Sequence, residues 1–184
     1  MFIPLGTDRP LERPTLLVYA LIAINAAVFV AQAYARRFTD ADAFAPFVLA
    51  SGGDLAFLGS EFWTLVTYGF LHADTLHLVF NMLFLYVMGP NVEDRFGRVG
   101  FLAFYLGGVI VSGLVHLTFS FYAVIGASGG VAAVTGAYLV LFPKTRIKVL
   151  WLFGIVIIPS WWIIAFAIAR DFLPIGLWRS NIAH

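Results

Sequence analysis

Long apolar runs, each about as long as a membrane is thick, constrain this chain more than any other feature. A helix that crosses the hydrocarbon core needs about 20 largely apolar residues, and residues 16–34, 71–88, 101–122 and 149–169 meet that requirement. Over the whole sequence 61% of residues are hydrophobic and 11% are charged, whereas soluble domains average about 25% charged residues. We therefore expect an all-α fold, a polytopic membrane helix bundle.

A further apolar run, residues 128–141, is too short to cross a membrane in the ordinary way. At about 1.5 Å per residue it reaches about 21 Å, against a hydrocarbon core of about 30 Å, and Pro143 ends it. Either this run fails to span, or the loop before it dips into the membrane. Together with the four long runs it gives five expected spans.

The first run leaves an alternative open, because it could belong to a signal peptide. Ala31-Gln32-Ala33 resembles a small-residue cleavage site. The apolar region is long for a signal peptide, however, and Arg36 and Arg37 follow it directly.

Basic residues predict how the chain lies in the membrane. Residues 143–148 include three basic side chains and no acidic one, so the positive-inside rule places them in the cytoplasm. The N-terminus and residues 91–98 are then cytoplasmic, and residues 38–70 form an outer loop. Arg36 and Arg37 fall on the outer side, against the rule. We expect residues 1–184 to form a single domain that crosses the cell membrane several times.

Composition excludes several classes of partner and chemistry. The chain has no cysteine, which removes disulfides, thiolate nucleophiles and cysteine-ligated metals. The formal net charge is +1, and basic residues lie at the ends of apolar runs, so nucleic acid is not an expected partner. The spacing of His72 and His77 does not match the helical His-Glu-x-x-His metal motif. We expect the lipid bilayer as a partner, and no metal or organic cofactor.

Three polar residues are expected at one depth in the membrane. His77 and Asn81 are four residues apart and share a helix face. From the outer end of their span they lie about 9 and 15 Å deep, and Ser128 lies roughly 10 Å below the same surface. Polar groups inside a bilayer are costly and suggest function. A hydroxyl at the start of a helix, facing hydrogen-bond donors, suits acyl transfer.

Two further roles could account for the serine. Gly126-x-Ser128-x-Gly130 fits the nucleophile elbow of soluble hydrolases, which requires a strand before the turn, and nothing here alternates like a soluble sheet. Ser128, Ala132 and Gly136 also form a small-residue face that lets helices approach closely. That packing role is compatible with a chemical one.

In order and spacing, these residues resemble the rhomboid family of intramembrane serine proteases. The family pattern has a His, a second His five residues later, an Asn four residues after that, and a later Gly-x-Ser-Gly that opens a short central helix. Here the pattern is His72, His77, Asn81 and Gly126-Ala127-Ser128-Gly129. Residues 92–97, Val-Glu-Asp-Arg-Phe-Gly, look like the family's Glu/Arg-Gly connection.

The resemblance implies a six-helix core in which Ser128 is the nucleophile. It assigns His77, Asn81 and Gly126, with the backbone N–H of Ser128, to stabilising the oxyanion. The implied base is a His at the outer start of the sixth span, and His184 is the candidate for it; alternatively, the base lies three residues further on. We expect the chain to be a fragment whose sixth helix is missing or truncated, and inactive if the base lies beyond residue 184.

The implied activity is hydrolysis of a peptide bond in or near a transmembrane segment of a membrane-protein substrate by a Ser-His dyad, at a site that opens to the outer side. The alternative is a non-catalytic rhomboid-like protein that binds membrane clients. Such relatives usually lack the serine or the histidine, whereas this chain keeps the serine. The two other histidines are expected not to react: His72 supports the outer loop or holds water, and His116 is a packing or interface residue.

Overall fold

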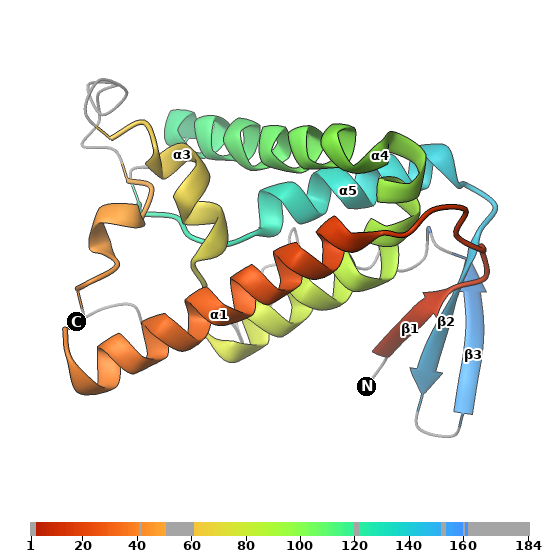
Figure 1. Ribbon diagram of the computed structural model, residues 1–184, viewed down its shortest axis with the longest axis horizontal. Helices are drawn as coiled ribbons and strands as arrows, with labels where there is room; N and C mark the ends of the chain where they lie inside the picture. The colour runs from red at the N-terminus through yellow and green to blue at the C-terminus, as the bar shows by residue number, and fades with distance from the viewer. Residues whose placement is uncertain are drawn as a thin grey trace.

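The computed structural model describes residues 3–40, 42–50, 61–119, 122–151, 154–159 and 161, and over these the chain is mainly helical. Three helices form a bundle, with a small sheet at one end (Figure 1). By length and composition, α1 and α4 could each cross a membrane, whereas α5 is shorter. The elements in chain order are β1 (Ile3–Thr7), α1 (Leu16–Phe38), η1 (Ala45–Phe47), α3 (Thr64–Thr67), η2 (Tyr68–Phe70), α4 (Thr75–Phe119), α5 (Ser128–Leu141), β2 (Arg146–Trp151) and β3 (Gly154–Pro159).

Helix α4 is a hairpin of two limbs rather than one straight rod. The chain turns at Gly97, whose φ of 71° lies in the left-handed region that glycine adopts without steric cost. Residues 75–96 run beside α1, and residues 98–119 return beside α5 (Figure 1). Each limb is about 33 Å long at 1.5 Å per residue, long enough for a hydrocarbon core of about 30 Å. Of the helices predicted over residues 71–88 and 101–122, residues 75–88 and 101–119 are confirmed as helical within these limbs, and residues 120 and 121 lie outside the described part of the chain.

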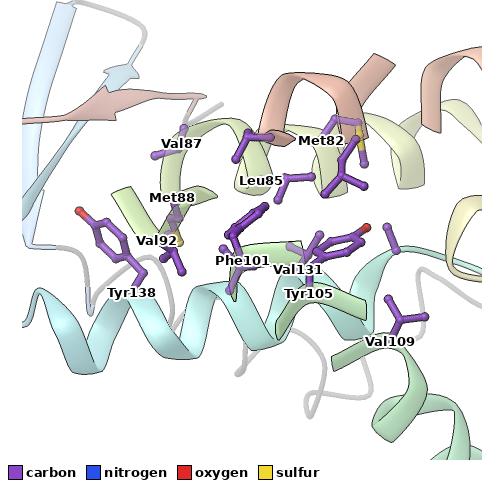
Figure 2. Packing of buried hydrophobic residues seen from close by; sticks show 14 of the residues in the cluster. Met82, Leu85, Val87, Met88, Val92, Phe101, Tyr105, Val109, Val131 and Tyr138 are labelled. Carbon is purple, nitrogen blue, oxygen red and sulfur yellow. The ribbon is translucent and has the colours of Figure 1, made fainter. Parts of the chain in front are cut away.

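The hydrophobic core lies between the limbs of α4, α1 and α5. Figure 2 shows Leu85 and Met88 of the first limb near Phe101 and Tyr105 of the second, with Val131 of α5 beside them. Small residues allow the close approach of α4 and α5. A Cβ added to Gly108 would lie 2.5 Å from the Cβ of Ala133.

The strand pair β2–β3 corrects the expectation of a helical span over residues 149–169. These strands pair antiparallel from Arg146 with Pro159 to Trp151 with Gly154, and β1 pairs with the other edge of β2. The segment is rich in Val and Ile, whose branched side chains favour strands, and an apolar run does not by itself distinguish a strand from a helix. The five-span prediction is wrong for residues 149–151 and 154–159, and residues 162–184 lie outside the described part of the chain.

Polar contacts gather three segments at the sheet end of the bundle. The Thr7 hydroxyl donates to Oδ1 of Asn91 at 3.0 Å, and the backbone N–H of Glu12 donates to Oδ2 of Asp94 at 3.2 Å. The Arg9 guanidinium lies 4.0 Å from the centroid of the Phe142 ring. Residues 91–98 and 143–148 therefore lie near one end of the bundle, as expected of connections on one side of a membrane.

Candidate active site

The loop before α5 brings His77 close to the predicted nucleophile. Gly126 has a φ of 131°, a conformation that side chains disfavour. A Cβ added there would lie 2.8 Å from Nε2 and 2.7 Å from Cε1 of His77. The imidazole of His77 therefore lies directly against the backbone of Gly126, two residues before Ser128. Glycine is required at this position both for its backbone conformation and for the space it leaves.

Ser128 is the first residue of α5, and its side chain is exposed. The first N–H groups of a helix have no carbonyl partner within the helix, and the helix dipole makes this end positive. The preceding residue, Ala127, is buried. An exposed hydroxyl thus lies beside backbone donors that can stabilise a negatively charged oxygen.

The two glycines after Ser128 let α5 pack closely against the second limb of α4. A Cβ on Gly129 would lie 2.5 Å from the Cβ of Ser112, and one on Gly130 would lie 2.6 Å from the Tyr105 ring. These close approaches fix the position of the helix start that carries Ser128.

Asn81 lies one helical turn beyond His77, on the buried side of α4. Its side chain is 8% exposed, and its Nδ2 has no hydrogen-bond partner among the described residues. A buried amide without a partner costs free energy, so Nδ2 is a donor available to a group bound at this depth.

The start of α4 positions His77 through its neighbours. Oδ1 of Asp74 accepts a hydrogen bond from the backbone N–H of His77 at 2.9 Å, which is the geometry of a helix N-cap. The His72 ring is fully buried, and its centroid lies 5.1 Å from that of His77, edge to face. Burial, and then the nearby His77, lower the pKa of His72 to about 4. His72 is therefore neutral near pH 7 and adds no positive charge beside His77.

Tyr68 anchors the loop before Ser128 from the α3–η2 segment. Its carbonyl accepts a hydrogen bond from the N–H of Gly126 at 2.9 Å, and its hydroxyl donates to the carbonyl of Val109 in α4 at 2.6 Å. The same residue therefore connects the α3–η2 segment and the second limb of α4 to this loop.

Two further contacts hold the beginning of that loop. The N–H of Val124 donates to the carbonyl of Leu49 at 2.9 Å. Nε2 of His116 lies 2.9 Å from the carbonyl of Tyr122, and since a carbonyl only accepts, Nε2 carries the proton in this contact. His116 thus has a specific structural role, to hold the loop.

Some of the predicted site residues lie close together in the structure, and one lies outside the described part of the chain. His77 meets the Gly126–Ser128 loop, and Asn81 follows one turn beyond. His184 lies outside the described residues. Within the described part of the chain, no three His, Asp or Glu residues are grouped as metal ligands.

Three residues of this region were not predicted from the sequence. Asp74 could have been found, because an Asp three residues before His77 at the start of an apolar run is an N-cap signal. Gln32, whose side chain accepts a hydrogen bond from the N–H of His72, is a polar residue inside a span and could also have been singled out. Tyr68 gave no signal, since its contacts arise only in the folded chain.

Comparison with known proteins points to one family. A family model described as the Rhomboid domain matches residues 59–184. Rhomboid protease GluP of Bacillus subtilis is 37% identical over 86 residues, covering 47% of this chain and 17% of that protein. Rhomboid protease GlpG of Haemophilus influenzae is 34% identical over 77 residues, covering 42% of this chain and 40% of that protein.

A plant relative matches over a longer stretch. RHOMBOID-like protein 12, mitochondrial, of Arabidopsis thaliana is 27% identical over 186 residues, covering 91% of this chain and 53% of that protein. The chain thus spans about half or less of the length of these relatives.

Proposed function

This chain belongs to the rhomboid family, whose members are embedded in membranes and are generally intramembrane serine proteases, and on that premise we propose that it carries the nucleophile of such a protease. The observation that supports the proposal most is the contact of the His77 imidazole with Gly126, two residues before Ser128. An imidazole N–H at this contact would be a hydrogen-bond donor near the start of α5, where Ser128 is exposed.

In the proposed reaction, Oγ of Ser128 attacks the carbonyl carbon of a peptide bond in or near a transmembrane segment of the substrate. The backbone N–H of Ser128, the imidazole of His77 and Nδ2 of Asn81 stabilise the oxyanion that forms. A histidine, for which His184 is the candidate, takes the hydroxyl proton and delivers it to the leaving amine. Water then hydrolyses the acyl-enzyme. Loss of one oxyanion donor typically costs roughly 10²–10³ in rate.

The substrate would reach this site from within the membrane. Many apolar side chains on α1 and on both limbs of α4 are exposed, including Val30, Val79 and Val111, as expected of helices that face lipid. With residues 143–148 in the cytoplasm, the end of the bundle that carries Ser128 opens toward the outer side. The proposed location is therefore the cell membrane, with several spans.

The test is labelling of the full-length natural protein, in detergent, with a fluorophosphonate probe that reacts with activated serines. We expect labelling of the wild type and of Thr118→Ala, which removes an exposed hydroxyl of α4, and none of Ser128→Ala. Cleavage of a transmembrane peptide in liposomes should follow the same order. Equal labelling of the wild type and Ser128→Ala would remove Ser128 from the nucleophile role. Binding of the peptide without cleavage or labelling would favour a client-binding protein.

A further inference from the structure

The last turns of α1 hold the backbone just before α4. Oε1 of Gln32 accepts a hydrogen bond from the N–H of His72 at 3.0 Å. The two terminal nitrogens of Arg36 donate to the carbonyls of His72 and Ala73, each at 3.2 Å. Both backbone polar groups of His72 are therefore bonded to side chains of a helix that lies 36 to 40 residues earlier in the chain.

Further contacts connect the hydrogen-bonded backbone of His72 to the candidate active site. The buried His72 ring lies edge to face against the His77 ring, and Asp74 caps the helix turn that carries His77. The His77 imidazole then lies against Gly126. A shift of the His72 backbone would therefore move the first turn of α4, and with it His77, relative to the loop of Ser128.

Gln32 and Arg36 are both unusual at their positions if α1 crosses a membrane. Gln32 is 5% exposed within an apolar run, where polar groups are unfavourable unless they are used. Arg36 lies at the end of the bundle where the positive-inside rule predicts few basic residues. The hydrogen bonds to residues 72 and 73 give both side chains a role that hydropathy and charge do not explain.

We propose that Gln32 and Arg36 are positioning residues, which fix His72 and thereby the alignment of the His77 imidazole with the backbone at Gly126. The inference rests on the proposed function, in which His77 stabilises the oxyanion. Because such a donor acts on the transition state, misalignment lowers kcat and leaves KM unchanged. A misplacement of about 1 Å can cost about 10²-fold in rate.

The experiment measures kcat and KM for cleavage of a transmembrane peptide by the full-length protein in liposomes. Gln32→Met removes the acceptor at similar size, and Arg36→Gln removes the fork of donors. We expect each to lower kcat roughly ten- to a hundredfold, and Arg36→Lys, which keeps the charge and can still donate, to recover part of the loss. The matched control is Arg37→Gln. Arg37 is exposed and lies over the Phe38 ring, and its replacement should leave kcat unchanged.

A double-variant measurement separates positioning from general destabilisation. If Gln32 acts through His77, Gln32→Met should lower kcat no further in a His77→Ala background. Additive losses, or losses that follow a lowered melting temperature, would overturn the positioning role.

Hydrogen exchange provides a readout that does not depend on catalysis. The amide of His72, which donates to Gln32, should exchange faster in Gln32→Met, and also in Arg36→Gln because the neighbouring carbonyls lose their donors, than in Arg37→Gln. Faster exchange with unchanged kcat, in a protein whose activity requires Ser128, would overturn the positioning role alone. Activity that does not require Ser128 would overturn the proposed function, and the positioning role with it.

Discussion

Among single residues, His72 shows how the fold sets the ionisation of a side chain near the candidate site. It lies in the loop ahead of α4 and is 0% exposed. Burial is the main cause that lowers its pKa to about 4, and the nearby His77 adds to the effect, whereas a hydrogen bond with the backbone of Phe70 and then the charge of Asp74 oppose it. The usual value for histidine is about 6.5. The folded protein therefore keeps His72 neutral at pH values where the unfolded chain would protonate it.

This difference predicts acid sensitivity with a definite sign. Between about pH 6.5 and pH 4 the unfolded chain binds a proton that the folded protein does not, so the free energy of unfolding decreases as the pH falls through this window. Above it, His72 is neutral in both states and contributes nothing. We expect the melting temperature in detergent to fall less between pH 7 and pH 4 for His72→Gln than for the wild type. Parallel curves for the two proteins would contradict the lowered pKa.

Residue spacing predicted part of the candidate site because that part is local. His77 and Asn81 share a face of one helix, so their separation of four residues determines their relation. The contact of His77 with Gly126 is not local, and only its depth could be estimated from the sequence. The contact of Gln32 with His72 joins residues 40 apart, and no periodic pattern encodes it.

At the scale of elements, the start of α1 is completed by a residue of another helix. Thr15, at the N-cap position, makes no side-chain capping bond. Instead the two carboxylate oxygens of Glu93 accept hydrogen bonds from the N–H groups of Leu17 at 3.0 Å and Val18 at 2.9 Å. Glu93 is 2% exposed, and an anion is favoured at a helix N-terminus. The carboxylate thus joins α1 to the first limb of α4 near the turn of the hairpin.

Replacement of Glu93 should therefore destabilise the bundle. Glu93→Gln keeps the size but places an amide N–H₂ group, which cannot accept, near one of the two helix N–H groups. Hydrogen bonds to charged groups contribute about 1.5–3 kcal/mol, so we expect a loss of about that size in the free energy of unfolding, measured by SDS titration in mixed micelles. Glu12→Gln, at an exposed position, should change it by less than about 0.5 kcal/mol. Equal stabilities of the two variants would contradict the capping role.

Helices whose ends are marked by local features were predicted well, whereas the strands, which are defined by their pairing, were not. The predicted short run, residues 128–141, has the same bounds as α5, because the Gly-rich loop and Pro143 mark its ends. Gly97 allows the turn between the two limbs of α4. Strand β2, in contrast, pairs on one edge with β1, 140 to 147 residues earlier in the chain, and on the other with β3, which follows it directly, and hydropathy carries no information about either pairing.

At the scale of the whole molecule, the bundle has two distinct ends. The sheet, the turn at Gly97 and residues 142–146 lie at one end (Figure 1). The contacts of Arg36 with His72 and of His77 with Gly126 lie at the other. The limbs of α4 that connect them are each about 33 Å long. If these limbs cross the membrane, the two ends face opposite aqueous compartments.

Site-directed labelling can test this arrangement, because the chain contains no cysteine and any introduced one is unique. Four exposed positions suit the test: Arg98→Cys and Lys144→Cys near the sheet end, and Asp42→Cys and Ala123→Cys near the end with Ser128. With an impermeant maleimide, we expect the first pair to react in inverted membrane vesicles and the second pair in intact cells. Reaction of all four from one side would contradict a bundle that spans the membrane. Reaction of both pairs from the reverse sides would keep the two-ended arrangement and show that Arg36 and Arg37, rather than residues 143–148, mark the cytoplasmic face.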